Sequence, residues 1–157
     1  MARLSDPQRR VPALSSLSTS AGVRHWDAVE GHVNLVIHLD GPAHPLPLAI
    51  AGLDGLREVV ALEILSETHR SESLDLELRH AYVFIESEPA RTAAIKAAME
   101  AMDPVASCAV VRGGCDLVVV VQGESFTAID RFVNDKIQHL DGILRLKKNR
   151  VIDLKQL

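Results

Sequence analysis

The sequence is short of aromatic residues and has no excess of positive charge. Phe, Trp and Tyr make up only 3% of its 157 residues, so the stacking platforms of most single-strand nucleic-acid binders are missing. The net charge of −4 provides no general attraction to nucleic acid or to an anionic membrane. No apolar run reaches the roughly 18 residues of a transmembrane helix, and no secretory leader is evident. We therefore expect a soluble cytoplasmic protein that binds no membrane.

Cysteine is also scarce, and the two that occur fit neither a zinc spacing nor a disulfide framework. Cys108 and Cys115 fall on two expected strands joined by a tight turn at Gly113-Gly114. This register places Cys108 opposite Val119, so we expect two free thiols. The chain also lacks a nucleophile motif and a phosphate-binding glycine loop, and we predict no catalytic residue, metal site or cofactor.

What the chain does contain is an internal repeat. A shift of 82 residues places related segments on one another, namely Ser5–Arg9 on Ser87–Arg91, Gly31–Val36 on Gly113–Val118, and Gly41 on Gly123. Units of roughly 70 to 80 residues are too long for solenoid modules and favour two copies of one small domain. We expect a degenerate copy in residues 1–68, a linker or strand in 69–79, and a better preserved copy in 80–157.

The second copy has the clearer order of elements. Its periodicity predicts strands over 80–86, 105–112, 115–122 and 143–154, and helices over 88–102 and 125–140. This order is that of the ferredoxin-like βαββαβ fold, in which both helices cover one face of a four-stranded antiparallel sheet. The other face needs a partner sheet. We therefore expect an α+β protein of the dimeric α+β barrel type, with two tandem copies that face each other through their sheets.

The first copy is a degraded version of the same pattern. Strands are expected over 23–30, 33–40 and 57–66, whereas residues 1–4 retain only the end of a first strand. Prolines at positions 12, 42, 45 and 47 interrupt the two helices. Residues 67–73 are predicted to be a polar connector. The alternation in 74–79 predicts a half-buried strand, which replaces the missing first strand or extends the first strand of the second copy.

Four segments of the second copy also occur together in one known family. They are an apolar first strand at Ala81–Ile85, a helix that opens at Glu88–Arg91, a glycine three positions before an aspartate in Gly113–Asp116, and a helix end at Ile137–Ile143. In these features the copy resembles the C-terminal effector domain of the leucine-responsive/asparagine (Lrp/AsnC) transcriptional regulators. The resemblance implies a domain that binds small effectors, often amino acids, between subunits and assembles into homo-oligomers.

The family's N-terminal helix-turn-helix is not visible in the first 60 residues, which are a strand-rich repeat. This departure favours a stand-alone effector domain, doubled in one chain, that does not bind DNA directly. The second departure is Cys115, at a motif position that is usually aromatic in the family. The third is Asn34, which replaces the aspartate in the first copy and makes that copy the weaker ligand binder.

The resemblance places the candidate effector-binding residues around the hairpin turn and the next loop. They are Gly113, Gly114, Cys115, Asp116, Glu124 and Ser125. The exposed glycine amides and the Asp116 carboxylate would hold the carboxylate and ammonium groups of an amino acid. The residues alone leave a structural alternative open, in which Asp116 caps the turn and Ser125 caps the following helix.

Two other clusters are candidate sites. Lys147–Arg150 would form a DNA-contacting stripe, but the charge pattern favours neutralisation of the basic segment 131–155 by the acidic segment 54–88. His38 and Asp40 share one strand face near two further histidines, yet this spacing does not impose the converging geometry of a metal site.

The leading prediction is a regulatory protein that senses a small effector, an amino acid, and forms homo-oligomers. An interaction module that forms mixed oligomers with full-length regulators is the alternative. A dimeric α+β barrel enzyme comes third, because the fold alone does not exclude catalysis.

Overall fold

The computed structural model describes residues 2–4, 17, 19–41, 48–52, 56–70, 75 and 77–152 of the chain. Its strands are β1 (Ala2–Leu4), β2 (Val23–Glu30), β3 (Leu35–Leu39), β4 (Leu56–Val59), β5 (Glu63–His69), β6 (Arg79–Ser87), β7 (Val105–Arg112), β8 (Leu117–Gly123) and β9 (Ile143–Val151). Its helices are α2 (Leu48–Ala51), α3 (Thr92–Glu100) and α4 (Phe126–Phe132), and α4 continues into the π-helical turn η1 (Val133–Ile137). Among these helices, none is long and apolar enough to cross a membrane.

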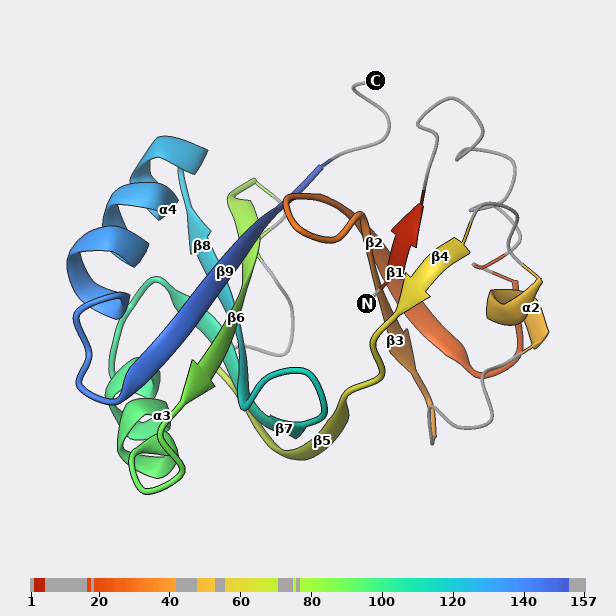
Figure 1. Cartoon of the computed structure of the whole chain (residues 1–157). Helices are drawn as coiled ribbons and strands as arrows, with labels where there is room; N and C mark the ends of the chain where they lie inside the picture. Colours follow the sequence, from red (N-terminus) through yellow and green to blue (C-terminus); the bar gives the residue numbers. More distant parts are fainter. Residues whose placement is uncertain are drawn as a thin grey trace.

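The described strands form one curled antiparallel sheet in the order β4-β1-β3-β2-β9-β6-β8-β7-β5. The first half contributes β4-β1-β3-β2 and the second half β9-β6-β8-β7, so the strands of each half follow the same relative order. Strands β2 and β9 join the halves, and β5 pairs with β7. Only residues 60–62 separate β4 from β5, so the two ends of the sheet order lie close together. In Figure 1 the helices lie on the outside of the curled sheet.

Alternation along β6, β7 and β8 gives the second half two apolar faces. One face packs on α3, α4 and η1, and its fully buried side chains include Ile85, Met99, Leu117, Ile129 and Ile137. The opposite face carries Tyr82 and Phe84, which pack with Val29 and Val36 of the first half. The face that an isolated ferredoxin-like sheet would expose is therefore covered by β2 and β3. At about 1.5–3 kcal/mol for each buried side chain of this size, the two halves stabilise each other.

Backbone hydrogen bonds recur between the halves at the 82-residue shift. In the first half, the backbone N–H groups of Ser20, Val23, Val29 and Asp40 donate to the carbonyl oxygens of Leu17, Ser20, Asn34 and Gly22, respectively. In the second half, the equivalent N–H groups of Met102, Val105, Val111 and Gln122 donate to Met99, Met102, Asp116 and Pro104. Gly31 and Gly113, which open the two hairpin turns, have φ angles of +155° and +144°. The two hairpins thus share one backbone geometry.

The elements expected in the second half are confirmed, although the helices are shorter. The helix expected over 88–102 spans Thr92–Glu100, and the one expected over 125–140 consists of α4 and η1. The expected register is also confirmed, because Cys108 pairs with Val119. Both cysteines are buried free thiols. In the first half, the short strand at the N-terminus is present as β1 and the strand expected over 23–30 is β2.

Three expectations around the linker are wrong. The single strand expected over 57–66 is two strands, β4 and β5. Residues 67–69, expected in a connector, belong to β5, which pairs with β7 from Glu63 to His69. In place of a strand, Glu77 and Leu78 form a turn. Every side chain of β5 is exposed, so pairing with β7, not an apolar face, makes this segment a strand. The prolines at 12, 42, 45 and 47 and the leucines at 74 and 76 lie outside the described residues.

Candidate functional site

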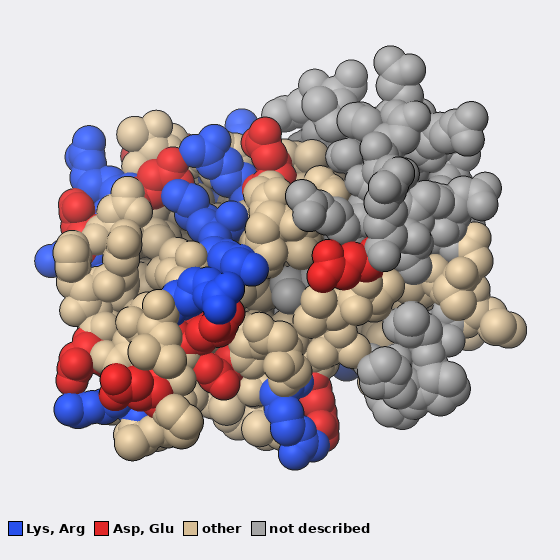
Figure 2. Space-filling model, viewed as in Figure 1, with Lys and Arg blue, Asp and Glu red and all other residues tan. Residues whose placement is uncertain are grey.

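Two of the candidate effector residues, Gly114 and Cys115, line a pocket of about 230 Å³ between the halves of the sheet. The second half also contributes Phe84, Glu86, Arg145 and Lys147, and the first half contributes His32, Val33, Glu58 and Val60. In Figure 2, Lys and Arg side chains gather over the region of β9. The pocket therefore combines the hairpin turn of the family motif with charged side chains from both halves.

The charges around this pocket are only partly neutralised. Arg145 Nη2 lies 3.1 Å from Glu86 Oε2. Lys147 and Glu58 form no ion pair with any side chain that the structure describes. Burial, together with the charges of Asp116 and Glu86, raises the pKa of Cys115 to about 11. Among the described side chains, the pocket thus offers a cation and an anion outside any ion pair, Lys147 and Glu58, and a protonated thiol.

Asp116 has a structural role in the fold. Its Oδ2 accepts a hydrogen bond from Ser87 N at 2.8 Å, and its own N donates to Ile85 O at 2.9 Å. These bonds attach the turn to the end of β6, whereas the structural alternative expected Asp116 to cap the turn through neighbouring amides. Gly113 allows the hairpin turn to pack closely against the backbone of Ala61, because a Cβ at this position would lie 2.4 Å from Ala61 O. Both residues shape the pocket wall without lining it.

Glu124 and Ser125 do not share a cleft with the turn, contrary to expectation. They follow the opposite end of β8, which has seven residues. At about 3.3 Å per residue, the strand separates the two groups by about 23 Å. Ser125 Oγ accepts a hydrogen bond from Ala128 N at 3.1 Å and so caps α4. Glu124 is exposed.

The basic run Lys147–Arg150 does not form a continuous stripe. Alternation along β9 sends Lys148 and Arg150 to Asp130 of α4, where Arg150 Nη2 lies 2.7 Å from Oδ2. Asn149 between them is fully buried. Burial raises the pKa of Asp130, but the bonds from Lys148 and Arg150 outweigh it, and the pKa lies below its ordinary value. The neutralising carboxylate for these two cations is thus Asp130, outside the acidic segment 54–88.

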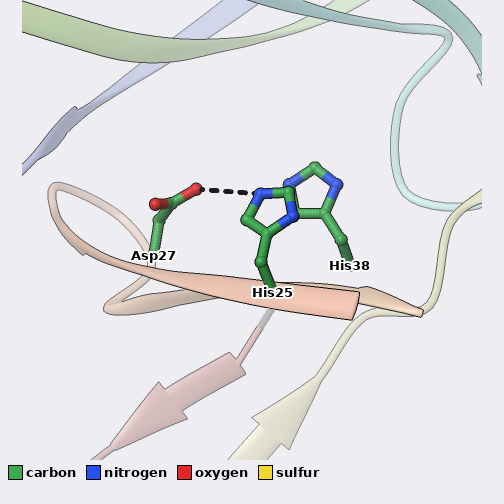
Figure 3. A group of neighbouring side chains, drawn as sticks. All are labelled: His25, Asp27 and His38. Atoms are coloured by element: carbon green, nitrogen blue, oxygen red, sulfur yellow. Dashed lines mark ion pairs between the residues drawn. The ribbon is translucent and has the colours of Figure 1, made fainter. Parts of the chain in front are cut away.

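A second polar cluster, which was not predicted from the sequence, lies on β2 and β3 (Figure 3). His25 and Asp27 are two residues apart on one face of β2, and His38 pairs with His25 across the strands. One donor atom from each of the three lies within 4.8 Å of the other two. Asp40, the expected neighbour of His38, instead accepts a hydrogen bond from Arg24 Nε at 2.7 Å. The sequence does carry one indication of this cluster, because the two-residue spacing of His25 and Asp27 places them on the same face of a strand.

Tyr82 of β6 connects this cluster to the second half. Its hydroxyl donates to Asp27 Oδ2 at 2.5 Å and lies 2.8 Å from His38 Nε2. Because the single hydroxyl proton goes to Asp27, the His38 Nε2–H donates to the Tyr82 oxygen. Burial and the charge of Asp27 raise the pKa of Tyr82, so the hydroxyl stays protonated.

Burial and neighbouring groups fix the protonation states of His38 and Asp27. Burial, with a contribution from the charge of His25, lowers the pKa of His38 to about 4, so the ring is neutral near pH 7. Burial raises the pKa of Asp27, but hydrogen bonds from His25 and Tyr82 outweigh it and leave the pKa below its ordinary value. The cluster therefore presents a carboxylate beside a neutral imidazole.

Several solved structures resemble the chain. A protein from Thermus thermophilus is 27% identical over 48% of this chain and 94% of its own, with a TM-score of 0.46. A hypothetical protein from Pyrococcus horikoshii is 21% identical over 48% and 93%, with a TM-score of 0.45. A major regulator of staphylococcal pathogenesis is 10% identical over 97% and 98%, with a TM-score of 0.50, which is a likeness of fold alone. None of the curated proteins compared with the chain matches it.

One family model matches the second half. Its description is Lrp/AsnC ligand binding domain, and the match covers residues 80–154. It begins in β6 and runs through β9, so it spans the complete ferredoxin-like unit with α3 and α4. Residues 80–154 are therefore similar to an Lrp/AsnC ligand-binding domain.

Proposed function

We propose that this protein is a regulator that binds a small effector, an amino acid, in the pocket between its two halves. The observation that carries the proposal is that Lys147 and Glu58, a cation and an anion with no ion pair among the described side chains, both line the pocket beside the turn at Gly114. A zwitterion needs both charges. Lys147 and Arg145 suit its carboxylate, and Glu58 suits its ammonium group.

The size and lining of the pocket support an effector with a small apolar side chain. Its volume of about 230 Å³ lies below the range of about 300–1,000 Å³ typical of sites for drug-sized ligands. Val33, Val60 and Phe84 provide an apolar wall. An aliphatic amino acid fits this chemistry better than a charged or large aromatic one.

We also propose that the first half is a diverged copy of the second. The shared strand order and the recurring hydrogen bonds support this proposal, and so do two matching contacts. A Cβ on Gly31 would lie 2.7 Å from Lys148 O, and a Cβ on Gly113 would lie 2.4 Å from Ala61 O. A shift of 87 residues places Ala61, just after β4, on Lys148 of β9, so the two hairpins pack on corresponding positions of the opposite halves.

This relation explains why the pocket is charged asymmetrically. The same shift of 87 places Glu58 on Arg145 and Val60 on Lys147, which line opposite walls. In a dimer of identical copies these walls would carry equal charges. Divergence of the two halves makes one wall acidic and the other basic, which suits a ligand with two different ends.

Self-association is proposed through the outer edge of β5. This strand ends the sheet order, so one of its edges has no partner strand among the described residues. Ile64 and Leu65 on β5 are 53% and 54% exposed. Exposed edges with apolar side chains pair readily with a second copy. Mass photometry of the wild type and of Leu65→Lys tests this, and a wild type that is monomeric at all concentrations would contradict it.

Effector binding is tested by calorimetry and thermal shift with each of the twenty amino acids. We expect an aliphatic amino acid to raise the melting temperature and to bind with one site per chain. Lys147→Met should weaken binding, because it removes the cation but keeps the length of the side chain. Lys136→Met is the matched control, because Lys136 is exposed on η1, away from the pocket. Absence of binding by every amino acid would refute the proposal.

A second candidate function is an interaction module that forms mixed oligomers with full-length Lrp/AsnC regulators. The hydrogen bond from Ser87 to Asp116 favours it, because one oxygen of the motif's carboxylate already has a partner within the fold and the residue does not line the pocket. Mass photometry of the chain mixed with such a regulator distinguishes the two. Mixed complexes without any amino-acid binding would support the module, and binding without mixed complexes would support the sensor.

A further inference from the structure

The His25, Asp27 and His38 cluster occupies positions that the fold does not require to be polar. At the 82-residue shift its members correspond to Ser107, Ala109 and Val120. Ala109 and Val120 belong to the apolar cluster between the halves. Placing polar groups in such positions costs free energy unless they gain partners. In the first half these partners come from within the cluster and from Tyr82, so a connected polar set occupies positions that are mostly apolar in the second half.

We propose that His25, Asp27 and His38 bind a divalent transition-metal ion, with Zn²⁺ as the expected occupant. Two imidazoles and a carboxylate are donors that zinc prefers, and three protein ligands leave a fourth position for water. With metal–ligand distances of about 2.0–2.2 Å, the donor atoms of a tetrahedral zinc site lie about 3.3 Å apart. The three donors here already lie within 4.8 Å of one another.

Metal binding requires one local rearrangement. The rings of His25 and His38 are stacked, with centroids 3.9 Å apart and planes 16° from parallel. A metal ion lies in the plane of each imidazole that binds it, so two stacked rings cannot share one ion. The side chain of His25 is 50% exposed and has room to rotate, whereas His38 is held by Tyr82. Rotation of the His25 side chain therefore completes the set of three ligands.

Tyr82 provides the outer-shell support that metal sites need. Its hydroxyl holds Asp27 Oδ2, and such second-shell bonds fix the orientation of a ligating carboxylate. His38 now carries its proton on Nε2, so binding of the ion to that atom moves the proton to Nδ1 and releases the hydrogen bond to Tyr82. His80 lies on the same face of β6 as Tyr82. Its Nε2 is the one buried side-chain polar atom in the described part of the chain without a hydrogen-bond partner. A metal-bound water is a partner of the kind that His80 lacks.

The decisive experiment uses the full chain, without a histidine tag and stripped with EDTA. Co²⁺ is titrated as a spectroscopic substitute for Zn²⁺, because its visible d–d absorption reports coordination, and Zn²⁺ affinity is measured by calorimetry. We expect one ion per chain and an absorption spectrum of low-coordinate Co²⁺. A dissociation constant weaker than about 1 mM would overturn the proposal.

Three variants separate a built site from adventitious binding. His25→Ala removes an exposed ligand, so it leaves the fold intact, and should weaken affinity by more than the roughly 10- to 100-fold typical of losing an outer-shell partner. Tyr82→Phe keeps the buried ring and should weaken affinity within that range while preserving stoichiometry. His139→Ala removes an exposed histidine elsewhere and should change nothing. Equal affinities in His25→Ala and His139→Ala would refute the site. The outcome is independent of amino-acid binding, because the two sites share no residue.

Discussion

Asn149 provides the sharpest test of how the two halves are held together. It is fully buried on β9, and its Oδ1 accepts a hydrogen bond from Val33 N at 3.1 Å. Its Nδ2 lies 2.9 Å from His32 Nδ1, which is the acceptor because an amide nitrogen only donates. Both partners belong to the hairpin of the first half. A single side chain of the second half thus satisfies two groups of the first.

Substitution of Asn149 by Ala should therefore destabilise the protein substantially. Each lost hydrogen bond costs about 1 kcal/mol, and the Val33 N–H left buried without an acceptor adds about 1–3 kcal/mol. The sum is about 3–5 kcal/mol. At about 2–4 °C per kcal/mol for a domain of this size, the melting temperature should fall by about 10 °C.

The assay is urea unfolding followed by circular dichroism, together with thermal melts at matched concentration. Asn134→Ala, on an exposed position of η1, is the control and should lie within about 0.5 kcal/mol of wild type. A loss below about 1 kcal/mol in Asn149→Ala would mean that water replaces the missing acceptor, and the reasoning would fail.

Two further predictions concern titration and thiol chemistry. Asp130→Asn should destabilise the protein by about 1 kcal/mol near pH 7, because Lys148 and Arg150 lose their carboxylate. The pKa of Asp130 is lower in the folded state than in the unfolded one. The stability difference between wild type and Asp130→Asn should therefore persist above the ordinary carboxyl pKa and vanish as the pH falls through the pKa of the folded state. Urea denaturation from pH 7 to pH 2.5 measures this difference, and a value that does not change with pH would contradict the prediction. Cys108 and Cys115, whose pKa values burial raises to about 11, should react with a thiol reagent at pH 8 far more slowly in the native protein than in urea; equal rates would show that the native thiols are exposed.

The fold of the second half was predictable because its local signals agree. The apolar run of β8, the turn at Gly113-Gly114 and the apolar spacing of the helices all require the same topology. The turn also determined the register of Cys108 and Val119, because a hairpin's loop length decides which residues face each other. Strand β5 was not predictable in the same way. Its seven side chains are all exposed, so its sequence records no buried face.

The candidate site was predictable only in part. Gly114 and Cys115 line the pocket, but Glu58 comes from β4 and Arg145 and Lys147 from β9, and the proximity of these strands depends on the curl of the whole sheet. The role of Asp116 depends on the end of β6, 29 residues away in the chain. The cluster with His25 required pairing of β2 with β3, in addition to the spacing along one strand. The periodicity of a segment predicts which of its residues share a face, whereas a site depends on how the faces of several strands are arranged in the folded protein.

The pairing of β5 with β7, and of β2 with β9, makes both halves part of one continuous sheet within a single polypeptide. Partners that are covalently tethered meet at a fixed effective concentration, whatever the total amount of protein. Dilution therefore does not separate the two walls of the pocket, as it would in a dimer of free subunits. A signal read from this pocket would depend on the abundance of the ligand and be insensitive to how strongly the protein is expressed.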